Sequence, residues 1–304
     1  MNDQLKSKDL LDAQQLLDQL FSEVTAEEGM MSGGTKLKLG PGGEALQALR
    51  ETKVAFGNPI NNLIRLTPKL FTEVGVELTE IRKRQMRKEF DFYYLTLTLS
   101  LQPRRGAKFV RLECSLDFAP KGINEPIVQT IFPTSEWKEV LNWGGGMKLG
   151  LGSNLDFHSE VNLPSTYIEQ LPGHVMAKIA TENTLKGFIT IPDYSFKLGR
   201  ADIVATGEGN SHCFWRIEKP DLQEVQTVQL GVVFKVPKGT TSIELTGLLA
   251  AEPSINWLTA HVRNVFEYLS ENMQALLRRK LQQRNGMERL PIGDHEKWTI
   301  TLPQ

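Results

Sequence analysis

The stretch "FDFYYLTLTLSLQPRRGAKFVRLECSLDF" (residues 90–118) predicts β-structure, because apolar and polar side chains alternate along both of its halves. A period of two is typical of β-strands that are buried on one face. Between the halves, Gly106 can adopt the positive φ that a tight turn requires. Folding the chain back at Arg105 and Gly106 would place Leu97 opposite Cys114, and the neighbouring inward pairs would be apolar as well. We therefore expect an antiparallel β-hairpin.

A second stretch, "GMKLGLGSNLDFHSEVNL" (residues 146–163), alternates in the same way. A three-residue loop at 152–154 would place Leu149 opposite Phe157, so we expect a second hairpin here. Pore-forming proteins that insert hairpins use this pattern with strands of about 9–11 residues, and an ordinary half-buried sheet uses it too. The pattern therefore predicts a strand pair and leaves both environments open.

Both ends of the chain show helical periodicity. In residues 1–28, apolar side chains recur at intervals of three and four. The run "SINWLTAHVRNVFEYLSENMQALLRRKLQQR" (residues 254–284) carries an apolar seam with the same spacing. About thirty residues would form a continuous helix of roughly 45 Å. Between the two ends, short alternating runs separated by turn residues indicate several more strands.

These patterns predict an α+β protein, with a central antiparallel β-sandwich flanked by an N-terminal helix and a long amphipathic C-terminal helix. We expect four parts. They are an N-terminal amphipathic helix (1–28), a Gly-rich tether with a short helical or irregular segment (29–88), one large or two small β-sandwiches (89–252), and a C-terminal helix with a tail strand (253–304).

Composition narrows the class of protein. The net charge of −1 argues against a nucleic-acid partner held by bulk electrostatics. Two cysteines make no disulfide framework, the N-terminus lacks the pattern of a secretory signal, and no stretch approaches the roughly 20 apolar residues of a membrane-spanning helix. We therefore expect a cytoplasmic protein.

Motifs for catalysis are weak. The Gly-rich runs at 31–43 and 142–148 lack the Gly-Lys-Ser/Thr ending of a phosphate-binding loop. His212 and Cys213 are adjacent in a predicted strand, so their side chains point to opposite faces and cannot form a dyad, and Cys213 reads as a core residue. The sequence predicts no cofactor and no catalytic residue.

One candidate metal site remains. Asp156, His158 and Glu160 project from the same face of the second alternating stretch and carry ligand types that a metal accepts. A solvated sheet face explains the same three residues. The corresponding function would be that of a metal-dependent hydrolase.

Candidate contact residues come from three stretches. They are the alternating stretch at 146–163, the helical run at 254–284 and a basic run at 81–90. The run "IRKRQMRKEF" (residues 81–90) is strongly basic and suits an acidic membrane or an acidic protein face. The candidate contacts for a partner or a membrane are Leu149, Leu151, Phe157, Leu258, Val262, Leu269, Met273, Arg82, Lys83 and Arg84.

The leading hypothesis is a non-catalytic cytoplasmic interaction protein that binds a protein partner or itself through the sandwich and the terminal helices. The alternative is a pore-forming effector that inserts the hairpins at 92–118 and 147–163 into a membrane.

Overall fold

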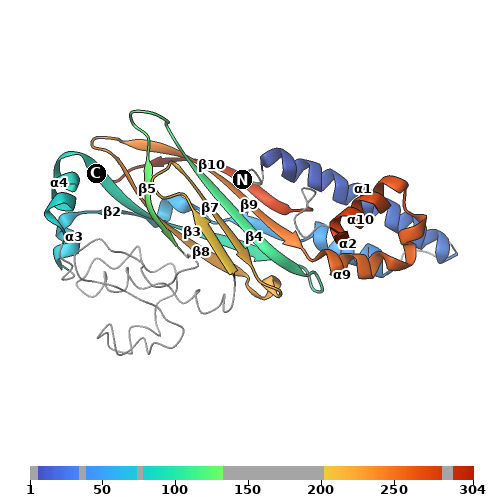
Figure 1. Cartoon of the computed structure of the whole chain (residues 1–304). Helices are drawn as coiled ribbons and strands as arrows, with labels where there is room; N and C mark the ends of the chain where they lie inside the picture. Colours follow the sequence, from blue (N-terminus) through green and yellow to red (C-terminus); the bar gives the residue numbers. More distant parts are fainter. Residues whose placement is uncertain (1–5, 34–38, 74–77, 133–201, 283–289) are drawn as a thin grey trace, which may run out of the picture.

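Two antiparallel five-stranded sheets pack face to face in the computed structural model (Figure 1). The structure describes residues 6–33, 39–73, 78–132, 202–282 and 290–304. Sheet A consists of β1 (Lys53–Phe56), β2 (Leu63–Leu66), β3 (Phe90–Gln102), β8 (Thr227–Pro237) and β5 (Ile127–Phe132). Sheet B consists, in order, of β10 (Ile292–Thr301), β9 (Ser242–Pro253), β4 (Phe109–Ala119), β7 (His212–Glu218) and β6 (Asp202–Thr206).

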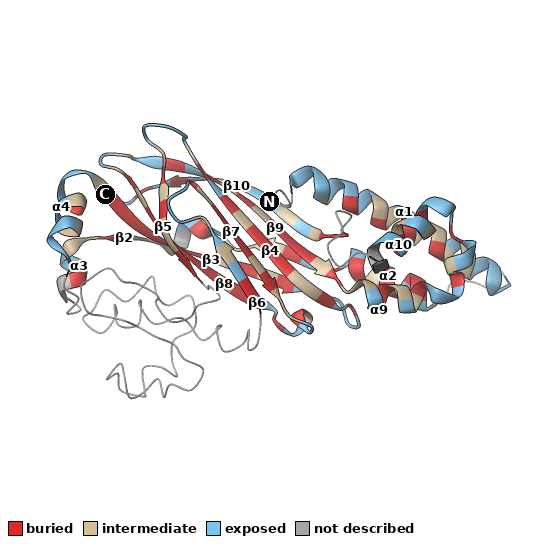
Figure 2. Ribbon diagram, in the orientation of Figure 1, coloured by how far each residue is buried: buried red, intermediate tan, exposed pale blue. Residues whose placement is uncertain are grey.

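The core lies between the sheets and is built from the apolar rows of the strands (Figure 2). Phe118 of β4 contacts Phe234 of β8 with ring centroids 5.0 Å apart, and Tyr93 of β3 stacks on Phe234 at 5.6 Å. The rows predicted to share a buried face are buried: Leu95, Leu97, Leu99, Leu101, Leu112, Cys114, Leu116 and Phe118. The predicted inward row is therefore confirmed in both halves of 90–118, but the opposite face of β3 is buried too at Phe92, Tyr94 and Thr96, so burial does not alternate over 91–97.

The predicted hairpin at 90–118 is wrong, because its two strands lie in different sheets. Leu97 of β3 is paired with Leu230 of β8, whereas Cys114 of β4 is paired with Trp215 on one side and Leu249 on the other. Gly106 does occupy the turn with φ +93°. A turn that crosses from one sheet to the other puts both apolar rows into the same core, so alternation alone cannot tell it from a hairpin.

Helices occupy the two ends of the sheet layers, and together with the antiparallel sheets they make this an α+β protein (Figure 1). One end carries a bundle of α1 (Ser7–Met31), α2 (Pro41–Arg50), α9 (Ile255–Val262), η4 (Arg263–Tyr268) and α10 (Glu271–Gln282). The other end carries α3 (Pro68–Glu73) and α4 (Glu80–Lys88). Two short 3-10 turns, η1 (Pro59–Asn62) and η3 (Leu222–Glu224), lie in connections.

The single long C-terminal helix does not form. The chain leaves helical geometry at Leu269 (φ −66°, ψ 154°), and the described part of the C-terminus ends with strand β10. Ser270 starts a new helix, because its hydroxyl oxygen accepts a hydrogen bond from the Met273 N–H at 3.4 Å. Glu23 of α1 accepts the N–H and O–H of Ser270 at 3.0 and 3.1 Å, which fixes the break against the bundle.

The sequence predicts a flexible Gly-rich connection after the first helix. In the structure, the last residues of this stretch begin helix α2. Pro41 occupies the first turn of α2, and the N–H groups of Gly42 and Gly43 donate to the two carboxylate oxygens of Glu28 at 2.8 and 3.0 Å. A carboxylate at a helix N-terminus satisfies free N–H groups and opposes the positive end of the helix dipole. A Cβ atom at Gly43 would lie 2.9 Å from a carboxylate oxygen of Glu28, so a larger residue there would require this carboxylate to shift.

Candidate functional site

Helix α4 is the most basic element of the described chain. Its start is capped by Thr79, whose hydroxyl accepts the Arg82 N–H at 3.3 Å. Arg87 and Lys88 lie in its last turn, where cations suit the negative end of the helix dipole. The helix buries only one apolar side chain, Met86, which is 4% exposed.

The inner face of α4 is held on sheet A by packing. Arg82 lies over the ring of Phe92 in β3, with the guanidinium carbon 5.4 Å from the ring centroid. It also donates to the amide oxygen of Gln129 in β5 at 3.5 Å. Burial lowers the pKa of Arg82 from its ordinary value. The helix therefore lies against both the centre of sheet A and its outer strand β5.

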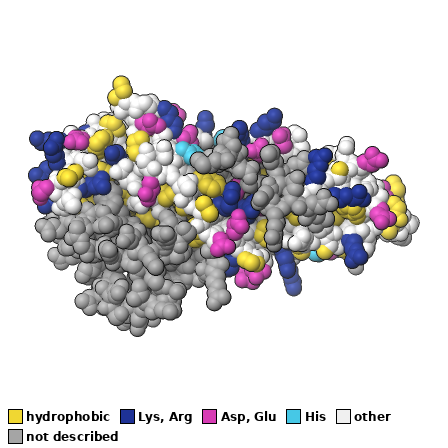
Figure 3. Space-filling model, viewed as in Figure 1, with side chains coloured by type: hydrophobic (Ala, Val, Ile, Leu, Met, Phe, Trp, Pro, Cys, Tyr) yellow, Lys and Arg dark blue, Asp and Glu magenta, His cyan; other side chains and the backbone are white. Residues whose placement is uncertain are grey.

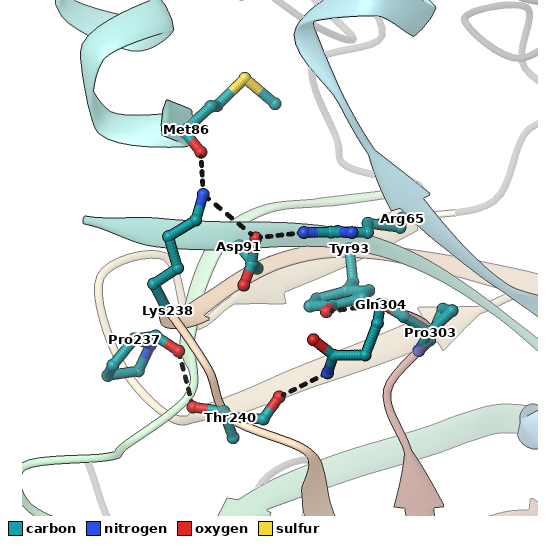
Figure 4. Close-up of polar contacts among 9 residues, drawn as sticks. All are labelled: Arg65, Met86, Asp91, Tyr93, Pro237, Lys238, Thr240, Pro303 and Gln304. Carbon is teal, nitrogen blue, oxygen red and sulfur yellow. Dashed lines mark hydrogen bonds and ion pairs between the residues drawn. The ribbon is translucent and has the colours of Figure 1, made fainter. Parts of the chain in front are cut away.

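A polar network ties the end of α4 to the sheet (Figure 4). The ammonium of Lys238 donates to the carbonyl oxygen of Met86 at 2.7 Å and lies 3.7 Å from a carboxylate oxygen of Asp91. The same oxygen of Asp91 accepts from Arg65 at 2.8 Å, and this hydrogen bond is the main reason that the pKa of Arg65 is raised. Asp91 is only 5% exposed, so the two cations compensate a buried charge.

The outer face of α4 carries charges without matching partners. Ile81 at its start is 74% exposed, and Arg84 is exposed with its carboxylate partner Glu89 at 3.7 Å. Arg87 and Lys88 are exposed, and no carboxylate of the described residues lies within ion-pair distance of either. Figure 3 shows Lys and Arg side chains gathered at this end of the molecule.

A second polar cluster joins the loops beside β4 and β7. The Lys121 ammonium lies 2.7 Å from a carboxylate oxygen of Asp117 and 2.5 Å from the Ser211 hydroxyl, which in turn donates to Glu125. The hydrogen bond from Ser211 is the main reason that the pKa of Glu125 is lowered. A lysine held between carboxylates is a poor base for an adjacent serine. Backbone hydrogen bonds also join these loops, such as Phe118 N–H to Ser211 O at 2.8 Å, so the cluster fastens them together.

The cysteines lie in the core, as the sequence predicts. Cys114 and Cys213 are free thiols at most 1% exposed, and burial raises the pKa of each well above its ordinary value. His212 is partly buried, and the pairing of Asp117 with His212 and of Leu116 with Cys213 puts the histidine and the cysteine on opposite faces of sheet B. Among the described residues, no group of three or more His, Cys, Asp or Glu side chains could hold a metal ion.

The predicted contact residues are found in three different situations. Arg82, Lys83 and Arg84 are brought together on α4, where Lys83 pairs with Glu80 at 2.8 Å. The apolar seam is buried inside the bundle: Leu258, Val262, Leu269 and Met273. The second alternating stretch lies outside the described residues, and with it Leu149, Leu151, Phe157, Asp156, His158 and Glu160.

Sequence reasoning missed the residues that hold α4 in place. Lys238 and Met86 are separated by 152 positions, and Arg65 lies 26 positions from Asp91. No local pattern links residues so far apart. The exposed face of α4, by contrast, was visible in the run of basic residues at 82–88.

Comparison with known proteins gives no family. No protein-family model matches the chain, and no curated protein matches it. Among solved structures, a "Pore forming protein" is similar at 6% identity and a TM-score of 0.30, with 66% of this chain and 78% of that chain covered. A collagen-binding domain from a Staphylococcus aureus adhesin is similar at 8% identity and a TM-score of 0.21, with 70% and 89% covered.

The NetB toxin of Clostridium perfringens, in its membrane-inserted form, is similar at 8% identity and a TM-score of 0.24, with 67% of this chain and 85% of that chain covered. TM-scores at this level are too low to establish a shared fold. Within the described residues, no helix combines the length and the apolar character needed to cross a bilayer.

Proposed function

We propose that this chain acts on membranes by inserting the alternating segment 147–163 into a lipid bilayer, while the two sheets remain outside as a folded anchor. The observation that carries the proposal is the place of this segment in the topology. It belongs to the connection 133–201, which leaves sheet A from the end of β5 and enters sheet B at the start of β6.

Both attachment strands are edges of their sheets. In the described part of the chain, β5 pairs only with β8, and β6 pairs only with β7. They lie on the same side of the molecule, where Val128 of β5 exchanges backbone hydrogen bonds with Gly209 and Asn210 at 2.8 Å. A segment attached at these two edges can change its surroundings without breaking any ladder among the described strands.

The other alternating stretch does not have this freedom. Strands β3 and β4 have neighbours on both sides, and their inward side chains form the centre of the core. Extracting 92–118 would break five strand pairings and expose a row of leucines, which would cost far more than the whole stability of a typical domain. The proposal therefore assigns membrane insertion to 147–163 alone.

The chemistry of 147–163 suits one face in lipid and the other in water. Its apolar row includes Leu149, Leu151 and Phe157, and its opposite row includes Asp156 and His158. Burying such polar groups unpaired would cost several kcal/mol each, so the opposite row must face water. A hairpin of a water-filled assembly satisfies both rows at once.

Dye release from liposomes tests this function. The purified full chain should release an encapsulated dye from vesicles that contain anionic lipid. Leu149→Asp and Phe157→Asp should abolish the release, because a charge on the lipid-facing row is costly within the bilayer. His158→Asp and Asn162→Asp add the same charge to the opposite row and should release dye like the unaltered chain. Equal release by all four variants, or no release from any vesicle, would overturn the proposal.

A second candidate function is that of a cytoplasmic interaction protein, as the terminal helices suggest. One observation favours it: Met30 and Met31 at the end of α1 are 73% and 59% exposed. Exposed methionines suit an adaptable protein contact. If the chain associates through them, sedimentation of the full chain should show concentration-dependent dimers that Met30→Ser with Met31→Ser removes; a monomer at all concentrations would count against self-association.

A further inference from the structure

We propose that the outer face of α4 binds the headgroups of anionic phospholipids and thereby docks the protein on its target membrane. This inference rests on the proposed membrane function and names the lipid class that the function requires. It is carried by the placement of charge and apolar surface on one helix.

The outer face is defined by helical geometry. At 100° per residue, positions 81, 84, 87 and 88 fall within one arc of about 120°. The buried Met86 and the half-buried Arg82 lie on the opposite side, against sheet A. The helix therefore presents Ile81, Arg84, Arg87 and Lys88 together, on the side that points away from sheet A.

The charge on this face is not cancelled within the described chain. Glu80 pairs with Lys83, and Glu89 lies at 3.7 Å from Arg84. Arg87 and Lys88 remain without a carboxylate within 4 Å among the described residues. Behind the helix, Lys235 of β8 adds positive charge, with its ammonium 4.4 Å from the ring centroid of Phe90. Negative headgroups would complement this arrangement.

The exposed Ile81 distinguishes a membrane from a nucleic-acid surface. An apolar side chain that is 74% exposed beside three cations matches the composition of surface-bound helices, whose apolar residues enter the boundary between headgroups and acyl chains. A nucleic-acid surface offers no such layer, and the chain as a whole carries a net charge of −1.

Helix α4 also contacts the strand that precedes the segment proposed to insert into the membrane. Arg82 of α4 hydrogen-bonds to Gln129 of β5, the strand that leads directly into residues 133–201. Docking through α4 would therefore hold the β5 edge of the sandwich close to the membrane surface.

Co-sedimentation of the full chain with vesicles tests the inference. The chain should bind vesicles of phosphatidylcholine with phosphatidylserine and should not bind phosphatidylcholine alone. Arg87→Glu with Lys88→Glu should weaken binding at least about 25-fold, since each basic residue near an anionic surface contributes roughly fivefold. Arg105→Glu with Lys108→Glu makes the same charge change in the exposed β3–β4 turn and should bind within about twofold of the unaltered chain.

A second pair of variants tests the apolar contact. Ile81→Ser should weaken binding several-fold, whereas Ile123→Ser, at a 96% exposed position in the loop after β4, should not. Equal binding by the α4 variants and their controls would overturn the inference. So would tighter binding of the lipid-free chain to polyglutamate than to phosphatidylserine vesicles at matched negative charge, because an acidic protein face would then be the preferred partner.

Tethering separates this inference from the proposed function. Attached by a terminal His-tag to nickel-chelating lipid, the Arg87→Glu/Lys88→Glu variant should recover dye release. If binding depends on α4 and no tethered chain releases dye, the proposed function fails and the docking surface stands. If the tethered unaltered chain releases dye but binding ignores α4, the docking surface fails and the function stands.

Discussion

The helices at the two ends of the sandwich are held by opposite means. The bundle of α1, α2, α9 and α10 is joined by an apolar seam, in which Leu20, Val24, Leu46 and Leu258 are completely buried. Helix α4 at the other end buries only Met86 and is fixed by Arg82, Lys238 and contacts around a buried carboxylate.

The difference separates stability from binding. An apolar seam stabilises the fold in proportion to the area that it buries. Its side chains are buried inside the bundle, so they cannot contact an external partner. A helix held by a few polar contacts leaves most of its side chains exposed, and their chemistry is free for an external partner. Substitutions in the bundle should therefore change stability, and substitutions on the outer face of α4 should change binding.

The largest expected effect is in the bundle seam. Leu20→Ala removes a fully buried side chain and should lower the free energy of unfolding by about 2–5 kcal/mol, through lost transfer energy and the cavity left behind. Leu11→Ala on the same helix, at a 67% exposed position, should change it by less than about 0.5 kcal/mol. Urea unfolding measures both. Similar effects at the two positions would mean that the seam does not hold the bundle.

The anchor of α4 should be the next most sensitive feature. Asp91→Asn keeps the size of the side chain but leaves Arg65 and Lys238 without their shared negative charge. We expect a loss of about 1.5–3 kcal/mol, typical of hydrogen bonds to charged groups. Asp202→Asn, which is exposed in β6, is the matched control and should be close to neutral in the same urea titration. An unaffected Asp91→Asn variant would show that packing alone holds α4.

A smaller effect is expected from pH. Burial is the main reason that the pKa of His212 is lowered, while Asp117 opposes the shift and Lys121 adds to it. The unfolded chain therefore takes up a proton near pH 6.5 while the folded chain does not, and stability should fall as the pH drops from about 7.5 to 5. His212→Asn should flatten this dependence, and substitution of the exposed His295 should leave it unchanged. An unaltered slope in His212→Asn would assign it to other groups.

The smallest effect on stability should come from the outer face of α4. Arg87→Glu with Lys88→Glu should lower the free energy of unfolding by no more than about 1 kcal/mol, because both side chains are exposed, lack carboxylate partners in the described chain and lose only their interaction with the helix dipole. Thermal or urea unfolding of the variant checks this directly. A loss of several kcal/mol would mean that α4 is a structural element like the bundle, and weaker lipid binding could no longer be attributed to its surface.

Sequence patterns predicted which side chains share a buried face, and that part was correct. The rows of β3 and β4, the buried thiols and the positive φ of Gly106 all follow from period, polarity and residue type. The partners of the strands did not follow, because facing rows in two sheets satisfy parity as well as paired rows in one sheet.

The break in the C-terminal helix had a local signal. Ser270 followed by Glu271 has the residue types of a helix start. The apolar spacing of three and four nevertheless continues through both residues, and this longer pattern predicts one continuous helix. The anchor of α4 had no local signal, since its members come from β2, β3 and the turn after β8 and meet only when the strands pair.

The most direct test of membrane insertion is the environment of single side chains along 155–161. Phe157→Cys and His158→Cys, each labelled with an environment-sensitive fluorophore, would report the two rows separately, since the buried Cys114 and Cys213 should not react in the folded chain. On anionic vesicles, the label at 157 should brighten and shift to shorter wavelength while the label at 158 stays as in water. Unchanged spectra at both positions, or the same shift at both, would contradict the account.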